Sequence, residues 1–528
     1  MRYTTIQTKG AVTSMSSTKW FAKFACLLLV MTILAACSGN SGSSAIQPTA
    51  NPSAPGAGSG GEQLDPVTLK IMVWGNRPAD FDSVLAEAES RMKDTLNVKL
   101  DVVFVPVSDI VQKSQMALAS GEEIDLIWDS PLVSMNSNIA SGYYEPLDDL
   151  LAQYGENILS TRPAEMFEGN KVNGKTYGVP LGASQYFGYT YLVRQDIREK
   201  LGIAPIKTYD ELVKFAYAVK ENEGGLSPIL PSTSFFSEAS FRSRFDQDTQ
   251  IRRTQAMSTI TLYYKNNDGI VYNLLDEMEP KVWKWIENAR KMYQDGIIHP
   301  DVLAVKDYEG EFSSGKAAII PVNDFGVKDN IEQTLLKNVP GSKVEAVTFF
   351  DSTPGKNITN YSQWNFINVP VTSKHKERAI QFLNWTQEKE NYDLLAYGLE
   401  GKNWEAVGDD KYKPLDADYA WFPYLWIWNP TFERFDASQS EDVVELNRFI
   451  KDAANFEKDI LTGFQFDSQP VLNEMTKYKT IEDKYYAALF NGVMDPQTGL
   501  ESFRKEAGPT LKKIQEEMQK QIDTFLQR

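Results

Sequence analysis

The chain has few thiols and imidazoles. Of its 528 residues only two are cysteine and two are histidine. Cys26 and Cys37 lie at the N-terminus, so a disulfide framework, a thiolate metal site and a cysteine nucleophile are excluded beyond residue 37. The histidines, His299 and His375, stand apart in a loop and at a helix start, which leaves almost nothing for a Ser-His-acid triad or a multi-histidine zinc site. We therefore expect no catalytic residue of these kinds.

Basic residues are also scarce relative to acidic ones. There are 54 Lys and Arg against 71 Asp and Glu, a net charge of −17, and the first 36 residues carry four basic and no acidic residues, which leaves −21 for the remainder. This charge argues against nucleic acid as a partner. A catalytic pair of carboxylates is not excluded by composition, because the 71 acidic residues offer many candidates. The composition, 42% hydrophobic, is that of a globular protein. About 460 residues follow residue 66, enough for two or three lobes.

No apolar run is long enough to span a membrane. The apolar run 24–36 has thirteen residues, whereas a spanning helix needs about 20. Lys19 and Lys23 precede it, as in a secretory signal peptide. The closing residues Leu34-Ala-Ala-Cys37 resemble the lipobox of bacterial lipoproteins. That resemblance implies that Cys37 carries a lipid (diacylglycerol, palmitate) and becomes the mature N-terminus. The alternative is an ordinary signal peptide with an incidental cysteine, and Met15 is a second possible start.

The residues after Cys37 predict a tether. Residues 38–66 are almost all Ser, Gly, Ala, Pro, Asn, Thr and Gln, a composition that cannot bury enough apolar surface to fold. A coil of about 28 residues spans roughly 30 Å. We expect residues 1–36 to be the lipoprotein signal peptide and 37–66 a flexible tether. The body would then be lipid-anchored on the extracellular face of the cell membrane. A plain disordered N-terminus is the alternative.

The first part of the body alternates strands and helices. Strand-like runs at 67–74, 98–105 and 124–128 are separated by helical periodicity at 79–96 and 108–119. This order predicts right-handed crossovers and a parallel sheet. Ligands of open α/β sheets bind at the carboxyl ends of the strands. We therefore expect a binding site where these strands end.

Later segments continue a mixed α/β pattern without an internal repeat. The clearest signals are an Asn-Gly hairpin turn, a capping box at a helix start, and a helix stopped by Asp-Gly. The last 60 residues are expected to alternate short helices and turns and to end in a charged helix. The predicted elements are the hairpin 172–177, strand 187–193, helix 212–220, helix 279–294, strand 317–322, strand 364–369 and a mostly helical segment 370–395.

Short motifs spread from about 67 to 525 resemble those of bacterial extracellular solute-binding proteins of the large sugar-binding lipoprotein type, common in Gram-positive bacteria. The segment Tyr397-Gly-Leu-Glu-Gly-Lys-Asn-Trp404 is the most specific. The others are Gly121-Glu-Glu-Ile-Asp-Leu-Ile-Trp128, Tyr144-Glu-Pro-Leu-Asp-Asp-Leu150, Gly174-Lys-Thr-Tyr-Gly-Val-Pro180, Val193-Arg-Gln-Asp196, Tyr293-Gln-Asp-Gly-Ile297, Phe312-Ser-Ser-Gly-Lys-Ala317, Phe382-Leu-Asn-Trp385 and Phe464-Gln-Phe-Asp467.

The resemblance implies an α/β, two-lobed, type II periplasmic-binding-protein-like fold with a hinge, an interlobe cleft and extra C-terminal helices. Lobe 1 would comprise 67–178 plus about 320–370, and lobe 2 would comprise 179–319 plus about 371–528. Such a protein captures an oligosaccharide and delivers it to the permease subunits of an ABC importer. Some alginate-binding relatives carry a calcium loop, but its ligands are missing here, and the Asn266–Gly269 stretch is better interpreted as a turn. We expect no metal and no cofactor.

A sugar site needs aromatic platforms for C–H faces and a few directed polar groups. Eleven tryptophans make platforms available. Strand-end placement favours Trp74 and Trp128, and polar loops favour Trp364 and Trp404. The polar partners that we expect are Arg77, Asp129, Tyr186, Gln363, Asn365 and Glu400.

Two other function classes stay open. A surface-anchored glycoside hydrolase would need two carboxylates about 5–10 Å apart, and no motif in the chain resembles such a pair. A glycan adhesin would bind without a transporter.

Overall fold

The computed structural model describes residues 64–182, 190–230, 251–322, 325–349, 357–415, 419 and 425–528. Residues 62–528 form one compact unit. The predicted signal peptide, nearly all of the predicted tether, Cys37 and Tyr186 lie outside the described residues. Within the described ranges, no helix combines the length and the apolar character needed to cross a bilayer.

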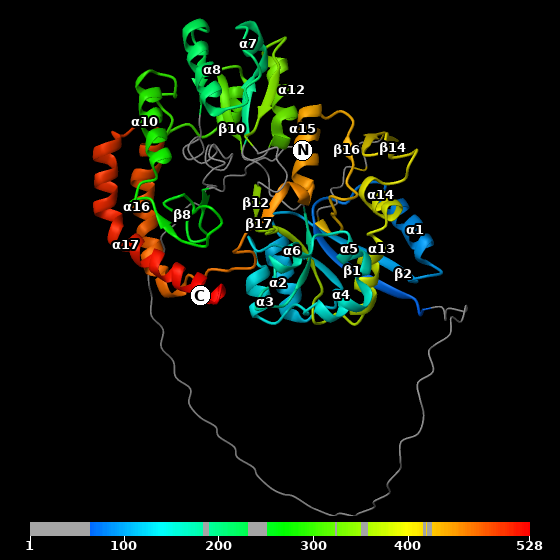
Figure 1. Cartoon of the computed structure of the whole chain (residues 1–528). Coiled ribbons are helices and arrows are strands. Elements are labelled where there is room, and N and C mark those ends of the chain that lie inside the picture. Colours follow the sequence, from blue (N-terminus) through cyan, green and yellow to red (C-terminus); the bar gives the residue numbers. More distant parts are fainter. Residues whose placement is uncertain are drawn as a thin grey trace, which may run out of the picture. The chain divides into compact units, whose positions relative to one another are not determined.

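The first core is built on a five-stranded sheet (Figure 1). Its order is β2 (Val98–Val105), β1 (Val67–Trp74), β3 (Leu126–Asp129), β13 (Asn365–Asn368) and β4 (Gly178–Leu181). Strands β2, β1 and β3 are parallel, as the sequence predicts. Strand β13 is antiparallel to both β3 and β4, so the complete sheet is mixed. The parallel part nevertheless has the predicted carboxyl edge.

Two helices join the parallel strands. The first, α1 (Phe81–Met92), buries Val84, Leu85 and Ala88 on one side together with its two terminal residues, the spacing of a helix that covers a sheet. The second, α2 (Ile110–Ser120), ends at Gly121, whose φ of +73° fits a left-handed C-terminal cap. Both predicted helices are therefore confirmed; α1 is shorter than expected at both ends, whereas α2 begins two residues later and ends one residue later than predicted.

The helices after β13 differ from the expected lobe boundary. The single segment predicted at 370–395 is two helices, α13 (Lys376–Trp385) and α14 (Lys389–Tyr397). Their apolar faces, including Ile380 and Leu395, belong to the same hydrophobic core as the first sheet, whereas the prediction placed them in lobe 2. The chain leaves β13 and packs directly back on the sheet, because both helices have a buried apolar side to cover there.

The second core surrounds a four-stranded sheet of order β11 (Val344–Val347), β5 (Thr190–Arg194), β10 (Ala317–Val322) and β6 (Ser227–Ile229). Strand β10 is parallel to β6 and antiparallel to β5. Although the prediction divided β10 between the lobes at about residue 320, the whole strand lies in this sheet. Helix α8 (Tyr209–Asn222) begins with the predicted capping box and packs on the same core.

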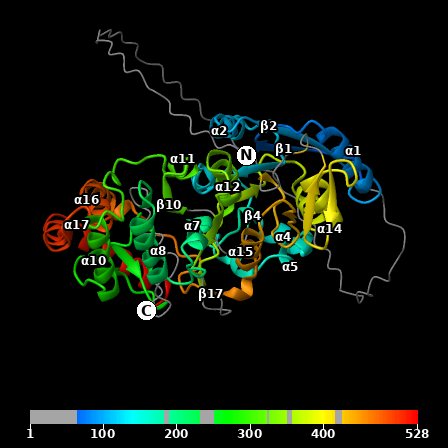
Figure 2. The same cartoon turned by 90° about the horizontal axis from the view of Figure 1, so that it is seen from above.

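The C-terminal region is more helical than expected. The prediction of short helices and turns is wrong, because α16 (Leu472–Phe490) and α17 (Pro496–Phe525) are long helices that pack side by side (Figures 1 and 2). Their buried residues, such as Phe503 and Ile514, belong to the second core. The C-terminal helices are thus part of that core.

Three small sheets and the remaining helices complete the described structure. The small sheets are β12 (Asn357–Thr359) with β17 (Phe456–Lys458); β7 (Arg252–Arg253) with β8 (Leu262–Tyr264) and β9 (Tyr272–Asn273); and β14 (Trp404–Val407) with β15 (Lys411–Pro414) and β16 (Phe435–Asp436). The remaining helices include α3 (Met135–Ala140), α4 (Asp148–Tyr154), α5 (Glu156–Ser160), α6 (Ala164–Glu168), α7 (Gln195–Lys200), α10 (Pro280–Gln294), α11 (Tyr308–Ser313), α12 (Lys328–Asn338) and α15 (Glu441–Lys451).

Candidate solute-binding site

Two of the predicted tryptophans meet at the carboxyl edge of the first sheet. Trp74 ends β1, and Trp128 stands one residue before the end of β3, which runs parallel to β1. Their ring centroids are 5.8 Å apart at an interplanar angle of 77°, an edge-to-face contact. Trp128 is buried and Trp74 is half-buried. The parallel register thus brings two indoles together from positions 54 residues apart in the chain.

The third member of this group comes from the neighbouring antiparallel strand. Asn365 begins β13, and its side-chain oxygen accepts a hydrogen bond of 3.1 Å from the indole N–H of Trp128. The preceding residue, Trp364, is half-buried. The structure therefore gathers Trp74, Trp128 and Asn365 into one contiguous cluster, with Trp364 beside it in the chain. We call Trp74, Trp128 and Asn365 the edge cluster.

Gln363 lies next to the end of β4. Its backbone N–H donates to Asn170 Oδ1 at 2.9 Å, and its side-chain NH2 donates to Tyr361 O at 3.1 Å. Gly182 has a φ of +152° and runs so close that a β-carbon there would lie 2.0 Å from Gln363 Oε1. Only glycine fits this approach. Gln363 is therefore held rigidly by the backbone around it.

Arg77 is anchored in the loop that follows β1. Its guanidinium donates to Val102 O at 3.1 Å, pairs with Asp82 and lies 5.0 Å from the ring centroid of Phe81. The side chain is about two-fifths exposed. Arg77 thus fixes a positive charge on the loop directly beyond Trp74.

Asp129 is held by hydrogen bonds inside the protein. It is buried, and its carboxylate accepts hydrogen bonds from the Ser130 N–H (2.7 Å), Ser134 Oγ (2.9 Å), Asn138 Nδ2 (2.8 Å) and Tyr144 Oη (2.7 Å). Burial, together with the neighbouring carboxylate, raises the pKa of Tyr144 well above its usual value, so the phenol stays a donor. Because these four donors use the carboxylate, Asp129 organises the loop after β3, and we leave it out of the binding surface proposed below.

Trp404 is likewise packed inside the protein. It is 4% exposed, its indole N–H donates to Gly398 O at 3.0 Å, and the Arg434 guanidinium lies 5.0 Å from its ring centroid. The exposed Glu400 stands in the turn just before it. That turn is tied to the N-terminal end of α1, because Asn403 Nδ2 donates to Asp80 Oδ2 at 2.9 Å. We leave Trp404 out of the proposed surface as well.

Two features of this edge were missed by sequence reasoning. Arg162 is buried, and its guanidinium donates to four neutral acceptors, Ile158 O (3.4 Å), Pro180 O (3.0 Å), Gln387 Oε1 (2.8 Å) and Trp428 O (3.2 Å). Burial lowers its pKa to about 10, so it remains charged near neutral pH. Nothing in the local sequence marks it, because three of its four acceptors lie 18 or more residues away in the chain. Arg162 ties the end of β4 to the segment after residue 425.

The second missed feature is an apolar rim after β3. Leu132 and Val133 follow the end of β3 and are 70% and 44% exposed. Val107, two residues beyond the end of β2, is 64% exposed. An apolar residue two or three positions after a strand end, here following Pro106 and Pro131, is the signal that could have found them. These residues follow β2 and β3, the two strands that flank β1 in the sheet.

The described residues contain no group of three or more acidic, histidine or cysteine side chains placed to hold a metal ion. The predicted turn at 266–269 is confirmed, with Asn266, Asn267 and Gly269 all at positive φ between +52° and +69°.

Comparison with known families gives the site its context. The profile of bacterial extracellular solute-binding proteins matches residues 87–398. The chain belongs to this family. It is thus a solute-binding component of transport and not an enzyme, and the hydrolase alternative is set aside. A domain of unknown function, DUF3502, matches residues 460–527.

Individual relatives agree with this assignment. The chain is 23% identical to a carbohydrate ABC transporter substrate-binding protein of Streptococcus pneumoniae serotype 4, over 88% of this chain and 91% of that one. Lipoprotein LipO of Bacillus subtilis is 22% identical over 58% of this chain and 62% of its own length.

Solved structures confirm the two-lobed fold. The N-glycan transport solute-binding protein NgtS of Streptococcus pneumoniae superposes with a TM-score of 0.68 at 20% identity, covering 88% of this chain and all of that one. An HMO-binding, ABC-transporter-associated solute-binding protein of Bifidobacterium longum infantis gives 0.59 at 16% identity, covering 87% and 99%. The resemblance inferred from the short motifs is therefore correct.

Proposed function

We propose that this substrate-binding component captures an oligosaccharide at the edge cluster and delivers it to the permease of an ABC importer. The observation that carries the proposal is the contact between Trp74 and Trp128 at the carboxyl edge of parallel strands, next to the amide of Asn365. This edge is where open α/β sheets bind ligands.

The chemistry of the cluster suits a sugar. A pyranose presents flat C–H faces, for which an indole offers an apolar platform, and hydroxyl groups, which an amide can both donate to and accept from. Asn365 Oδ1 accepts from Trp128, and its NH2 group supplies two donors. Gln363 and Trp364 precede it, and Arg77 supplies a cation beyond Trp74. We propose these residues, with Tyr186 and Glu400 as further contacts, as the solute-binding set.

The named relatives support the choice of solute class. One curated relative is described as a carbohydrate transporter component, and a structure of NgtS contains Man5GlcNAc. An oligosaccharide is therefore the class of solute to test first.

The test of binding uses residues 62–528, which form one compact unit, and a panel of mannose-containing N-glycan fragments and human-milk oligosaccharides. A bound glycan at a hundred times its Kd is expected to raise stability by about 2.7 kcal/mol and to be recovered uncleaved in mass spectrometry. If peptides raise the thermal midpoint and no glycan does, the proposed solute class is wrong.

Delivery to a permease is tested in cells. Deleting the gene is expected to abolish uptake of a labelled glycan that the body binds, and an unimpaired uptake would favour the adhesin alternative.

The membrane anchor is the second part of the proposal. A protein that hands its solute to a permease must stay near it, and lipid on Cys37 with a tether over 37–66 would achieve this. The relative LipO is named as a lipoprotein. Cys37→Ala is expected to leave the precursor unprocessed or to release the protein into the medium, while solute binding by the body is unchanged. Normal membrane fractionation of this variant would refute the anchor.

A further inference from the structure

The matched domain of unknown function begins where the two cores are joined. Phe349 belongs to the second core and Phe366 to the first. Between them, β12 pairs in parallel with β17, with Asn357 opposite Phe456 and Thr359 opposite Lys458. We call residues 357–361 and 456–465 the joint. The second of these segments leads into the C-terminal helices.

The joint contacts the first core directly. Lys458 Nζ lies 2.7 Å from a carboxylate oxygen of Glu168, and Gln465 Nε2 donates to Lys171 O at 3.1 Å. A β-carbon on Gly463, which has a φ of +84°, would lie 3.1 Å from Glu168 O. The joint therefore lies between α6 on the first core and the elements of the second core that hold it.

On the second core, the joint is held by several contacts. Arg252 pairs with Asp459, Gln255 donates to Phe464 O at 2.7 Å, and Leu461 and Phe464 are buried in the core.

Asn267 adds two hydrogen bonds. Asn267 has a φ of +52°, and its side-chain NH2 donates to Lys458 O at 3.0 Å while its Oδ1 accepts from the Ile460 N–H at 2.9 Å. These two bonds bracket Asp459. The Asp459 N–H in turn donates to Thr359 O at 2.9 Å, which ties β17 to the crossing strand β12. The Asn267 amide thus bonds to the residues on both sides of the crossover contact.

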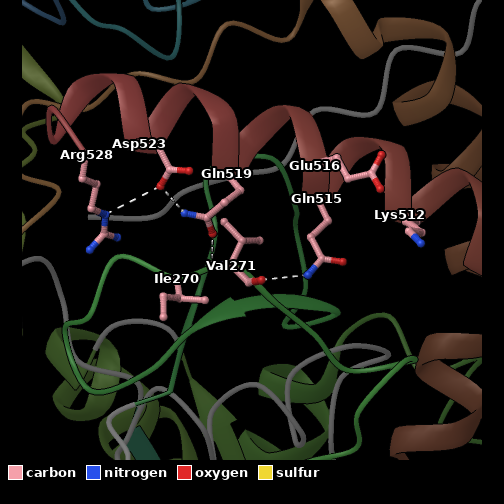
Figure 3. Close-up of a pocket in the computed structure, with 8 residues that line it drawn as sticks. All are labelled: Ile270, Val271, Lys512, Gln515, Glu516, Gln519, Asp523 and Arg528. Carbon is pink, nitrogen blue, oxygen red and sulfur yellow. Dashed lines mark hydrogen bonds and ion pairs between the residues drawn. The ribbon is translucent and has the colours of Figure 1, made fainter.

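The turn that carries Asn267 is held by the end of α17. Gln519 Nε2 donates to Gly269 O at 3.2 Å, and Gln519 Oε1 accepts from the Val271 N–H at 2.7 Å. Arg528 donates to Gly269 O at 2.8 Å. Figure 3 shows Gln519 on the side of α17 that faces Val271, with Arg528 beyond the end of the helix. These residues line a cavity of about 630 Å³. Hydrogen bonds therefore connect α17 to the turn, and others connect the turn to the joint.

We propose that α17 is a clamp that sets the geometry of the joint, with Gln519 on this helix and Asn267 in the turn as positioning residues. Loosening the clamp would let the joint open locally without dismantling either core. Solute affinity would then fall, because only the fraction of molecules with a correctly positioned joint binds well. This role goes beyond the proposed sugar capture and does not depend on the identity of the solute.

The test compares two glutamines on the same helix. Gln519→Ala removes two hydrogen bonds to the backbone that supports the turn. Gln521→Ala, the control, removes two of equal length (2.9 Å) to the backbone of Asp467, which lies beyond the joint. Asn267→Gly removes the bridging amide and keeps a residue that accepts positive φ. Hydrogen exchange is measured by mass spectrometry on the full chain purified in detergent, alongside thermal unfolding.

Peptides that cover 357–361 and 456–461 are expected to exchange about tenfold faster in Gln519→Ala and Asn267→Gly, the effect of losing one or two net hydrogen bonds. They are expected to exchange at the wild-type rate in Gln521→Ala, although this variant loses a similar amount of thermal stability. Equal acceleration in Gln519→Ala and Gln521→Ala would overturn the proposal, because the clamp would then act only through global stability. Unchanged exchange in Asn267→Gly would overturn it as well.

Discussion

Replacing Trp74 by alanine tests the edge cluster most directly. Trp74 is half-buried and contacts Trp128 edge-to-face at 5.8 Å. Trp128 is buried and is held in addition by its hydrogen bond to Asn365. Trp74→Ala therefore removes the more exposed ring and leaves the second one in place. Solute binding should weaken strongly while the sheet beneath persists.

The size of the effect follows from the area involved. A sugar face laid on the exposed part of one indole removes about 60 Å² of apolar surface from water, which is worth about 1.5 kcal/mol. The aromatic contact adds about 0.5 kcal/mol. The sum, about 2 kcal/mol, corresponds to an increase in Kd of about 30-fold. The loss of the contact with Trp128 should also lower the free energy of unfolding, by about 2 kcal/mol.

Isothermal titration with a glycan found in the binding screen measures the Kd. The matched control is Trp385→Ala, because Trp385 is also half-buried in the first core but lies at the end of α13, stacked on Phe382 with ring centroids 6.3 Å apart. This control should lose comparable stability and keep the wild-type Kd. If Trp74→Ala binds the glycan as tightly as the wild type, or if both variants weaken binding equally, the edge cluster is not the sugar platform.

Two further predictions concern stability. Asp129→Ala should cost about 3–5 kcal/mol in urea unfolding, because Ser134, Asn138 and Tyr144 would keep buried donors without their acceptor; a cost below 1 kcal/mol would contradict the structural role. Burial opposes ionisation of Asp442, but hydrogen bonding and the charge of Lys328 outweigh it and lower the Asp442 pKa. A lowered pKa stabilises the fold above the usual aspartate pKa of about 3.9, and the benefit is lost as pH falls through the folded-state pKa. The Asp442→Asn variant should therefore unfold at a lower temperature than the wild type at pH 7 and at the same temperature near pH 2. A difference in unfolding temperature that does not change with pH would contradict this.

The sequence predicted the parallel strands and their common edge well. The runs at 67–74 and 98–105 match β1 and β2 residue for residue. A period-2 or continuous apolar run followed by Gly75 or Pro106 is a local signal, and parallel pairing follows from the intervening helices. Because the carboxyl ends of such strands must share one edge, the meeting of Trp74 and Trp128 could be inferred without knowing any contact.

Burial of single residues could not be inferred in this way. Trp404 follows a polar loop in the sequence, but its exposure depends on the Arg434 guanidinium and on Gly398 O. Asp129 follows a strand end, as a ligand-binding acid would, but Asn138 and Tyr144 occupy its oxygens. Such partners lie 6 to 30 residues away, and no periodicity reports where their side chains point.

The C-terminal helix shows how packing overrides a local break. Gly508 and Pro509 interrupt the helical propensity of α17. The apolar period nevertheless continues on both sides, with Phe503, Leu511 and Ile514 all buried. Pro509 is exposed. It therefore removes one backbone hydrogen bond from the helix, while the buried face keeps its packing. Tertiary packing therefore carries the helix through the break, and only an uninterrupted α17 can position Gln519 against the turn that holds the joint.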